Sequence, residues 1–104
     1  MSKPKELKIL GKRVTIKWID GNPTPANPLL KSGFIGKSSS SGGWCVVDNT
    51  LSDDQQKDTL IHELFHLYNN DLNIALVEDQ IQRMAACTYQ LMRDNPKFVK
   101  WIMK

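Results

Sequence analysis

The chain is short and mildly basic, and its composition excludes several classes of protein. It has 104 residues, of which 40% are hydrophobic and 24% charged, with a formal net charge of +3. This length supports one domain with a modest core. No run approaches the ~18 apolar residues of a membrane span, and the polar N-terminus is not followed by the apolar stretch of a secretory signal. The lysines are scattered rather than clustered, which gives no argument for nucleic acid binding.

The two cysteines favour a reducing compartment. Cys45 and Cys87 lie far apart in the sequence and form no C-x-x-C pair. Isolated cysteines in a chain without a visible secretory signal are typical of reduced, packed thiols. We therefore expect a cytosolic protein.

Residues 5–20 have the pattern of a β-hairpin. Apolar residues alternate with basic and polar residues on both sides of Gly11-Lys12, which falls between the two runs as a short turn. One face of the hairpin should enter the core. The other face, with Lys8, Arg13 and Lys17, should stay in solvent.

The segment from 21 to 48 combines loop and strand signals. Three prolines between Gly21 and Ser32 exclude a regular element, so we expect a loop there. Strands are expected at 33–36 and 43–48. The serine-rich stretch 37–41 should be a flexible link between them, which completes a sheet region over residues 5–48.

A helix is expected at 53–69, and its start has a clear signal. Ser52 and Gln55 fit a capping box, in which the serine side chain accepts from the backbone N–H of Gln55 and the glutamine side chain accepts from the backbone N–H of Ser52. Acidic residues in the first turn complement the helix dipole. The polar run after the helix should form its C-cap and turn.

This helix carries the motif His62-Glu63-x-x-His66. Residues four positions apart share one face of a helix, so the two imidazoles can meet a single ion. Glu63 lies beside them, about 100° round the helix. This is the H-E-x-x-H arrangement of zinc hydrolases, in which the glutamate activates a metal-bound water.

Two more helices are expected after the motif helix. The first should span 76–93 and pack on the motif helix through apolar residues at helical spacing. Asn95 as N-cap and Pro96 at the first helical position should begin a third helix at 96–103, whose apolar side covers the core. The packing residues expected on these two helices are Ile81, Met84, Ala85, Thr88, Leu91 and Met92, then Phe98, Val99, Trp101, Ile102 and Met103.

A catalytic zinc usually takes three protein ligands and a water, so the motif needs one more ligand. Both histidines of the chain are already in the motif, which leaves a carboxylate or a cysteine. Glu78 is favoured, because it opens the second helix and has the longer reach. Asp79 and Asp71 are the alternatives.

A peptidase also needs an oxyanion donor and a surface that holds its substrate. Tyr89, Tyr68 and Arg83 are the candidates for the donor, with Tyr89 taken first because it shares a face with Glu78. In zinc hydrolases a strand beside the motif helix commonly forms an edge of the cleft, where an extended peptide pairs by β-addition. The strand ending at Asp48 is the candidate, and its Trp44 and Cys45 either line the cleft or pack in the core.

The motifs of the second half resemble small zincin-like proteins encoded by bacteriophages and prophages, similar to a minimal ImmA/IrrE-type metallopeptidase. The stretches that carry the resemblance are 59–66, 78–85 and 91–96. It implies an α+β, zincin-like fold, with a small antiparallel or mixed sheet packed against the H-E-x-x-H helix and a second C-terminal helix. It also implies zinc held by His62, His66 and Glu78, with Glu63 as the base. Relatives of this type generally place Asn or Asp four residues after the acidic ligand, where this chain has Gln82.

Two interpretations follow from these observations. The first is a zinc-dependent peptidase of phage or prophage origin that cleaves a protein substrate in the bacterial host cytoplasm, with Glu63 activating the water. The second is a non-catalytic protein that keeps the zincin scaffold, with a structural zinc, and binds a host or phage protein. An intact Glu63 favours the enzyme, because a purely structural site does not need it.

Overall fold

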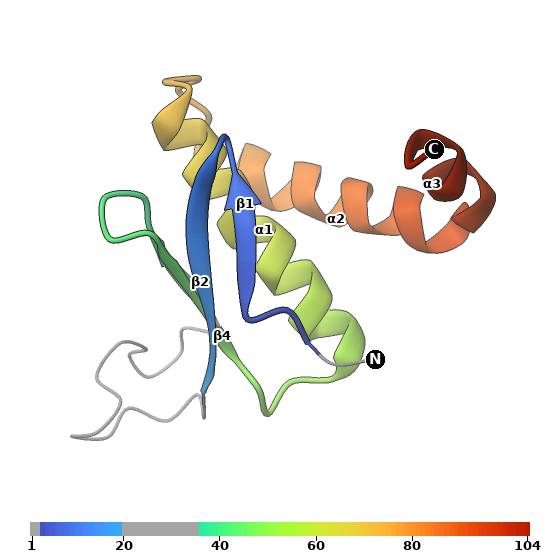
Figure 1. Cartoon of the computed structure of the whole chain (residues 1–104), viewed down its shortest axis with the longest axis horizontal. Coiled ribbons are helices and arrows are strands. Elements are labelled where there is room, and N and C mark those ends of the chain that lie inside the picture. The colour runs from blue at the N-terminus through green and yellow to red at the C-terminus, as the bar shows by residue number, and fades with distance from the viewer. Residues whose placement is uncertain (1–2, 20–35) are drawn as a thin grey trace.

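A computed structural model describes residues 3–19 and 36–104, so the expected loop at 21–32 and most of the strand expected at 33–36 lie outside the described residues. The described chain has an α+β fold, in which a four-stranded mixed sheet precedes three helices (Figure 1). The elements are β1 (Glu6–Ile9), β2 (Lys12–Ile19), β3 (Gly36–Ser39), β4 (Trp44–Asp48), α1 (Asp53–Asp71), α2 (Glu78–Asp94) and α3 (Pro96–Ile102).

The predicted N-terminal hairpin is confirmed. β1 and β2 pair antiparallel, with Ile9 opposite Lys12. The turn is centred on Leu10 and Gly11, one residue earlier than expected, and both have positive φ values of 52° and 80°. This conformation matches the right-handed twist of the flanking strands, and glycine adopts it without steric cost. The basic residues of the hairpin are exposed, as predicted.

The order of the sheet, β1-β2-β4-β3, corrects two expectations. β4 pairs with β2 in parallel and with β3 in antiparallel, so β4 is an interior strand and not the edge of a cleft. Among the strands of the described residues β3, like β1, is an edge strand, and it includes residues 37–39 of the stretch expected to be a flexible link. Serine has little strand preference of its own, but the ladder to β4, with Ser39 opposite Trp44, holds this segment extended.

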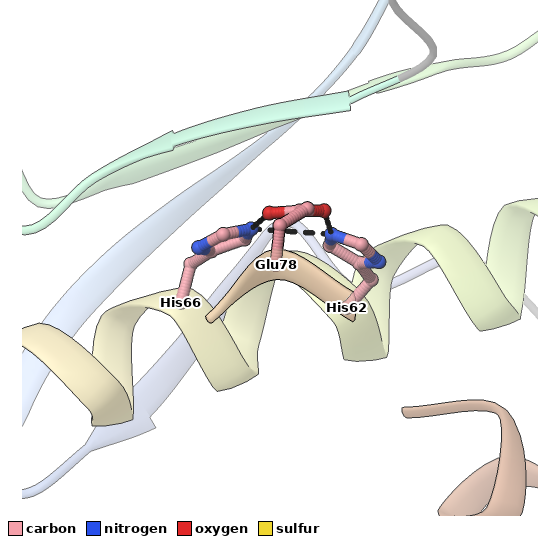
Figure 2. Close-up of side chains that lie close together, drawn as sticks. All are labelled: His62, His66 and Glu78. Atoms are coloured by element: carbon pink, nitrogen blue, oxygen red, sulfur yellow. Dashed lines mark hydrogen bonds and ion pairs between the residues drawn. The ribbon is translucent and has the colours of Figure 1, made fainter. Parts of the chain in front are cut away.

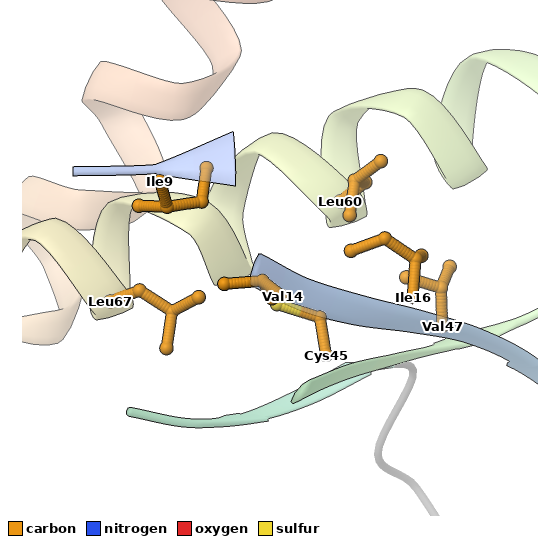
Figure 3. Close-up of a cluster of buried hydrophobic side chains, with 7 residues drawn as sticks. All are labelled: Ile9, Val14, Ile16, Cys45, Val47, Leu60 and Leu67. Carbon is orange, nitrogen blue, oxygen red and sulfur yellow. The ribbon is translucent and has the colours of Figure 1, made fainter. Parts of the chain in front are cut away.

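One face of the sheet packs against α1 and forms the core. Figure 3 shows Val14 and Ile16 of β2 together with Cys45 and Val47 of β4 facing α1. The remaining members of this cluster are Ile9, Leu60 and Leu67. α1 therefore packs across this face of the sheet, with its apolar side toward the strands.

The capping box at the start of α1 is confirmed: Gln55 N–H donates to the Ser52 hydroxyl at 3.3 Å, and Ser52 N–H donates to Gln55 Oε1 at 3.4 Å. α1 ends at Asp71, two residues beyond the expected end. Asn69 is not a C-cap, because its side chain bonds the backbone of Leu76 instead.

The second and third helices form, but their packing differs from the prediction. Ile81 and Ala85 of α2 are buried against α1, whereas Met84, Leu91 and Met92 are exposed. α3 lies at the far end of α2, away from the sheet (Figure 1), and none of its residues is buried. The expectation that α3 covers the core is therefore wrong. None of the helices in the described chain is both long and apolar enough to cross a bilayer.

Candidate metal centre

The site is built on the middle of α1. His62 and His66 lie one turn apart on the same side of the helix, and their Nε2 atoms are 3.1 Å apart. Both side chains are half-buried. Spacing along the helix alone brings these two nitrogens together, as the sequence predicted.

Glu78 completes the cluster from the first turn of α2. Its Oε1 lies 2.5 Å from His62 Nε2, and its Oε2 lies 2.7 Å from His66 Nε2. Figure 2 shows the two imidazoles and the carboxylate converging on one point. Of the alternatives, Asp79 forms an ion pair with Arg83 at 3.2 Å, and Asp71 contacts other partners. The structure thus brings together the three residues favoured by the sequence.

The position of Glu78 depends on a residue that sequence reasoning missed. The Asn69 side chain accepts a hydrogen bond from Leu76 N–H at 2.8 Å and donates one to the Leu76 carbonyl at 3.2 Å. This two-point contact fixes the backbone two residues before Glu78. Val77 N–H then donates to Gln80 Oε1 at 3.0 Å, which caps α2. The only signal in the sequence was an asparagine in a polar run. Such a residue is as typical of a turn as of a side chain that binds the backbone of a later segment.

The donor set suits zinc. Two imidazole nitrogens and one carboxylate match the His₂Glu ligand set of catalytic zinc sites. Two ligands at 2.0–2.1 Å from a tetrahedral ion lie about 3.3 Å apart, close to the 3.1 Å between the two Nε2 atoms. The Glu78 oxygens lie closer to these nitrogens, at 2.5 and 2.7 Å, so the carboxylate would have to move outward to admit an ion. Within the described residues, all ligand atoms of this group lie within 4.8 Å of one another.

Glu63 lies beside the cluster, between α1 and the edge strand β3. Its side chain is buried, and burial raises the pKa of the carboxyl group, while the hydrogen bond from Ser38 and the nearby histidines oppose that rise. Gly36 of β3 makes this close packing possible. A Cβ at Gly36 would lie 2.7 Å from Thr59 Cγ2 and 3.0 Å from Glu63 Oε2, too close for any other residue without a shift of the strand.

A cleft of about 700 Å³ opens between β3 and the helices, directly over the cluster. Its residues come from β3 and the β3–β4 turn on one wall and from α1 and α2 on the other. They are Gly36, Lys37, Ser38, Ser40 and Ser41, then His62, Glu63, His66, Leu67, Asn70 and Glu78. The serines that sequence analysis assigned to a loose link therefore form one wall of the site.

Asp71, the last residue of α1, holds that wall in place. The Ser40 hydroxyl donates to Asp71 Oδ1, and Lys12 Nζ lies 3.4 Å from Asp71 Oδ2. These contacts lower the pKa of the Asp71 carboxyl group, the bond from Ser40 most strongly. Asp71 thus connects two turns of the sheet to the end of the helix that carries the histidines.

The residues expected to donate to an oxyanion lie elsewhere. The Tyr89 hydroxyl donates to Asp54 Oδ1 at 2.5 Å, in the first turn of α1. Tyr89 follows Glu78 by three turns of α2, which is about 16 Å along the helix axis, so it cannot reach a substrate at the cluster. Tyr68 packs on the core, and Arg83 is exposed in its ion pair with Asp79.

Trp44 and Cys45, expected either to line the cleft or to pack, do not line it. Cys45 is fully buried in the core, where burial and then the charge of Glu63 raise the pKa of its thiol to about 12. Trp44 is half-buried at the start of β4. The interior position of β4 explains both placements.

Comparison of this chain with known protein families, with curated proteins and with solved structures found no match.

Proposed function

We propose that this protein is a zinc-dependent peptidase that hydrolyses peptide bonds of a protein substrate. The observation that carries the proposal is the position of Glu78, whose two carboxylate oxygens meet the two motif histidines. A chance H-E-x-x-H match on a surface helix would not come with an acidic side chain from a second helix at this point. We further propose that the chain is a minimal zincin of the ImmA/IrrE type that acts in the bacterial cytoplasm.

In this proposal His62, His66 and Glu78 hold the zinc ion. Zinc bound there would acidify a water molecule and polarise the carbonyl group of the scissile bond. Glu63 accepts a proton from the water and passes it to the leaving amine. Burial supports this role, because it raises the pKa of Glu63 and makes the carboxylate a better base.

The cleft walls supply groups that can bind a peptide backbone. The edge strand β3 lies along the cleft, so an extended peptide can pair with it by β-addition. Ser41 and Asn70 line the same cleft with exposed side chains, and both can donate a hydrogen bond to a substrate carbonyl. Ser38 is engaged by Glu63 and Ser40 by Asp71, so these two serines position protein groups instead.

The test combines zinc content with cleavage of a complex peptide mixture, read by mass spectrometry. The wild type is expected to bind about one zinc per chain and to produce new peptide termini. His62→Ala should lose both properties, whereas Glu63→Gln should keep zinc and lose cleavage. Glu6→Gln, an exposed carboxylate on β1, is the matched control and should behave as the wild type.

Two results would contradict the peptidase. Cleavage at the same bonds by Glu63→Gln would remove the proposed base. A wild type that binds zinc but yields no new termini under any condition would favour the second candidate, a non-catalytic zinc-binding scaffold for a host or phage protein. The exposed apolar surface of α2 and α3 is the observation that makes a binding role worth testing.

A further inference from the structure

The C-terminal part of the molecule exposes an unusual amount of apolar surface. We define the arm as residues 84–103, which includes most of α2 and all of α3. Figure 1 shows that it extends away from the sheet. Its exposed apolar residues are Met84 (44%), Leu91 (50%), Met92 (40%), Phe98 (41%), Trp101 (69%), Ile102 (56%) and Met103 (78%).

A second exposed apolar group lies at the other end of α2. The connection between α1 and α2 (residues 72–77) exposes Leu72 by 54%, Ile74 by 48% and Val77 by 60%. α2 thus separates the connection from α3 by its own length, about 25 Å for a helix of this size.

A stripe along α2 joins these two groups. Val77, Met84 and Leu91 follow one another at intervals of seven residues, the spacing that keeps side chains on one side of a helix. The exposed Cys87 lies on the same side, between Met84 and Leu91. The stripe runs beside the buried residues Ile81 and Ala85, and no element of the described chain covers it.

The amount of exposed surface is that of one half of a protein interface. From the exposed fractions, the apolar residues of the connection, stripe and arm expose on the order of 900 Å² in total, spread along α2 and α3, and a single apolar patch on a monomer is rarely more than a few hundred Å². A standard interface buries about 800 Å² on each partner. We propose that this surface binds a second copy of the same chain, with the two α2 helices antiparallel about a two-fold axis.

The antiparallel orientation predicts two specific contacts. Met84 and Leu91 lie on either side of Cys87, so antiparallel helices place Met84 of each copy against Leu91 of the other. The same arrangement places the arm of one copy on the connection of the other, which covers both apolar groups at once. A parallel arrangement would instead place arm on arm and connection on connection, so the charges of α2 and α3 decide between the two orientations.

Charge supports the same orientation and the same partner. α2 has Glu78 and Asp79 in its first turn, where Asp79 pairs with Arg83 and Glu78 is a proposed zinc ligand. At the far end Arg93 pairs with Asp94, and Lys97 and Lys100 of α3 leave the arm with a net positive charge. Antiparallel helices bring the acidic first turn of one copy to the basic arm of the other, which is favourable. An anionic lipid surface would attract only the basic end and would repel the acidic end of the stripe.

The experiment is sedimentation of the full-length protein from about 1 to 200 μM, with and without zinc. The wild type is expected to reach twice the chain mass of 11.8 kDa. Leu91→Glu and Met84→Glu place an unpaired charge in the stripe and should weaken the dimer by ~100-fold or more. Gln90→Glu, on an exposed part of α2 outside the stripe, is the matched control and should leave the dimer intact.

Mild oxidation tests the orientation separately. Cys87 would face Cys87 in either orientation, so the test uses a Cys87→Ser background. Antiparallel packing should cross-link a mixture of Met84→Cys and Leu91→Cys, whereas parallel packing would cross-link each of these variants with itself. A monomer at every concentration, or a dimer that Leu91→Glu leaves intact, would overturn the proposal. A Leu91-dependent dimer in which Met84→Cys cross-links with itself and not with Leu91→Cys would overturn the antiparallel orientation. A monomer whose tryptophan emission shifts to the blue on mixing with phosphatidylglycerol vesicles, with the shift lost in Trp101→Phe, would assign the arm to lipid instead.

Discussion

The two ends of α2 have the same kind of sequence but different surroundings. At its start, Glu78 meets two histidines, and Ile81 and Ala85 are buried against α1. At its end, Leu91 and Met92 are exposed although they belong to the same amphipathic pattern. An apolar residue at helical spacing is therefore buried only where a second element is present.

The length of α1 explains where the change occurs. The Tyr89 hydroxyl reaches Asp54, in the first turn of α1, so α2 beyond Tyr89 has passed the end of its partner helix. The site lies in the half of α2 that α1 supports. The proposed contact with a second copy lies mainly in the half that α1 does not reach.

The largest contrast is expected between two residues on the same face of α2. Ile81 and Met92 differ by eleven residues, which is close to three full turns. Ile81→Ala should reduce the free energy of unfolding by about 2–5 kcal/mol, because it leaves a cavity against α1. Met92→Ala, at a side chain that is 40% exposed, should cost less than about 1 kcal/mol. Urea unfolding of the two variants measures the contrast, and equal losses would show that the end of α2 is packed after all.

In the first half of α2, the proposed metal site can be tested at a single carboxylate, that of Glu78. Glu78→Gln should weaken zinc binding by roughly 100-fold, since the ligand oxygen loses its charge. Asp79→Asn, the neighbouring acid in its pair with Arg83, is the control and should leave affinity unchanged. Competition with a chromogenic chelator measures both. A loss in Asp79→Asn that equals the loss in Glu78→Gln would mean that the acidic ligand has been misassigned.

The close packing of β3 against Thr59 and Glu63 of α1 can be disturbed by a substitution on β3. Gly36→Ala adds a methyl group 2.7 Å from Thr59 Cγ2, and overpacking of this kind costs about 1–3 kcal/mol. Replacing glycine in a strand recovers about 0.5–1 kcal/mol, so we expect a net loss of about 1–2 kcal/mol. Gly11 has no atom within 4 Å of its ideal Cβ, and asparagine tolerates its positive φ. Gly11→Asn should therefore change urea stability little, and a Gly36→Ala variant as stable as the wild type would show that β3 can shift.

Sequence patterns predicted the local structure well because it depends on residues close together in the chain. The capping box at Ser52, the alternation around Gly11 and the i, i+4 spacing of His62 and His66 are all of this kind. Glu78 lies against both motif histidines, as expected, because a short connection limits how far it can lie from the motif.

Features that depend on distant segments were not predictable in the same way. The strand at 36–39 exists through its ladder to β4, which serine preferences do not reveal. The distance of Tyr89 from the site and the exposure of α3 both depend on where α1 begins relative to α2. A helical wheel of α2 alone shows an apolar face, but it does not show what that face meets.

A change of pH should distinguish the two cysteines, one in the packed body and one on the arm. Burial raises the pKa of Cys45 from 9.0 to about 12, so the folded state retains a proton that the unfolded state releases above pH 9. The stabilisation by the neutral thiol is therefore complete below pH 9 and is lost as pH rises from 9 to 12, at about 1.4 kcal/mol per pH unit. Urea unfolding at pH 8, 9 and 10 should show this slope in the wild type and a shallower slope in Cys45→Ala. Cys87→Ser should keep the full slope, because Cys87 is exposed in the folded chain. A wild-type slope that persists in Cys45→Ala would mean that another group causes it and that the core around β4 admits the thiolate.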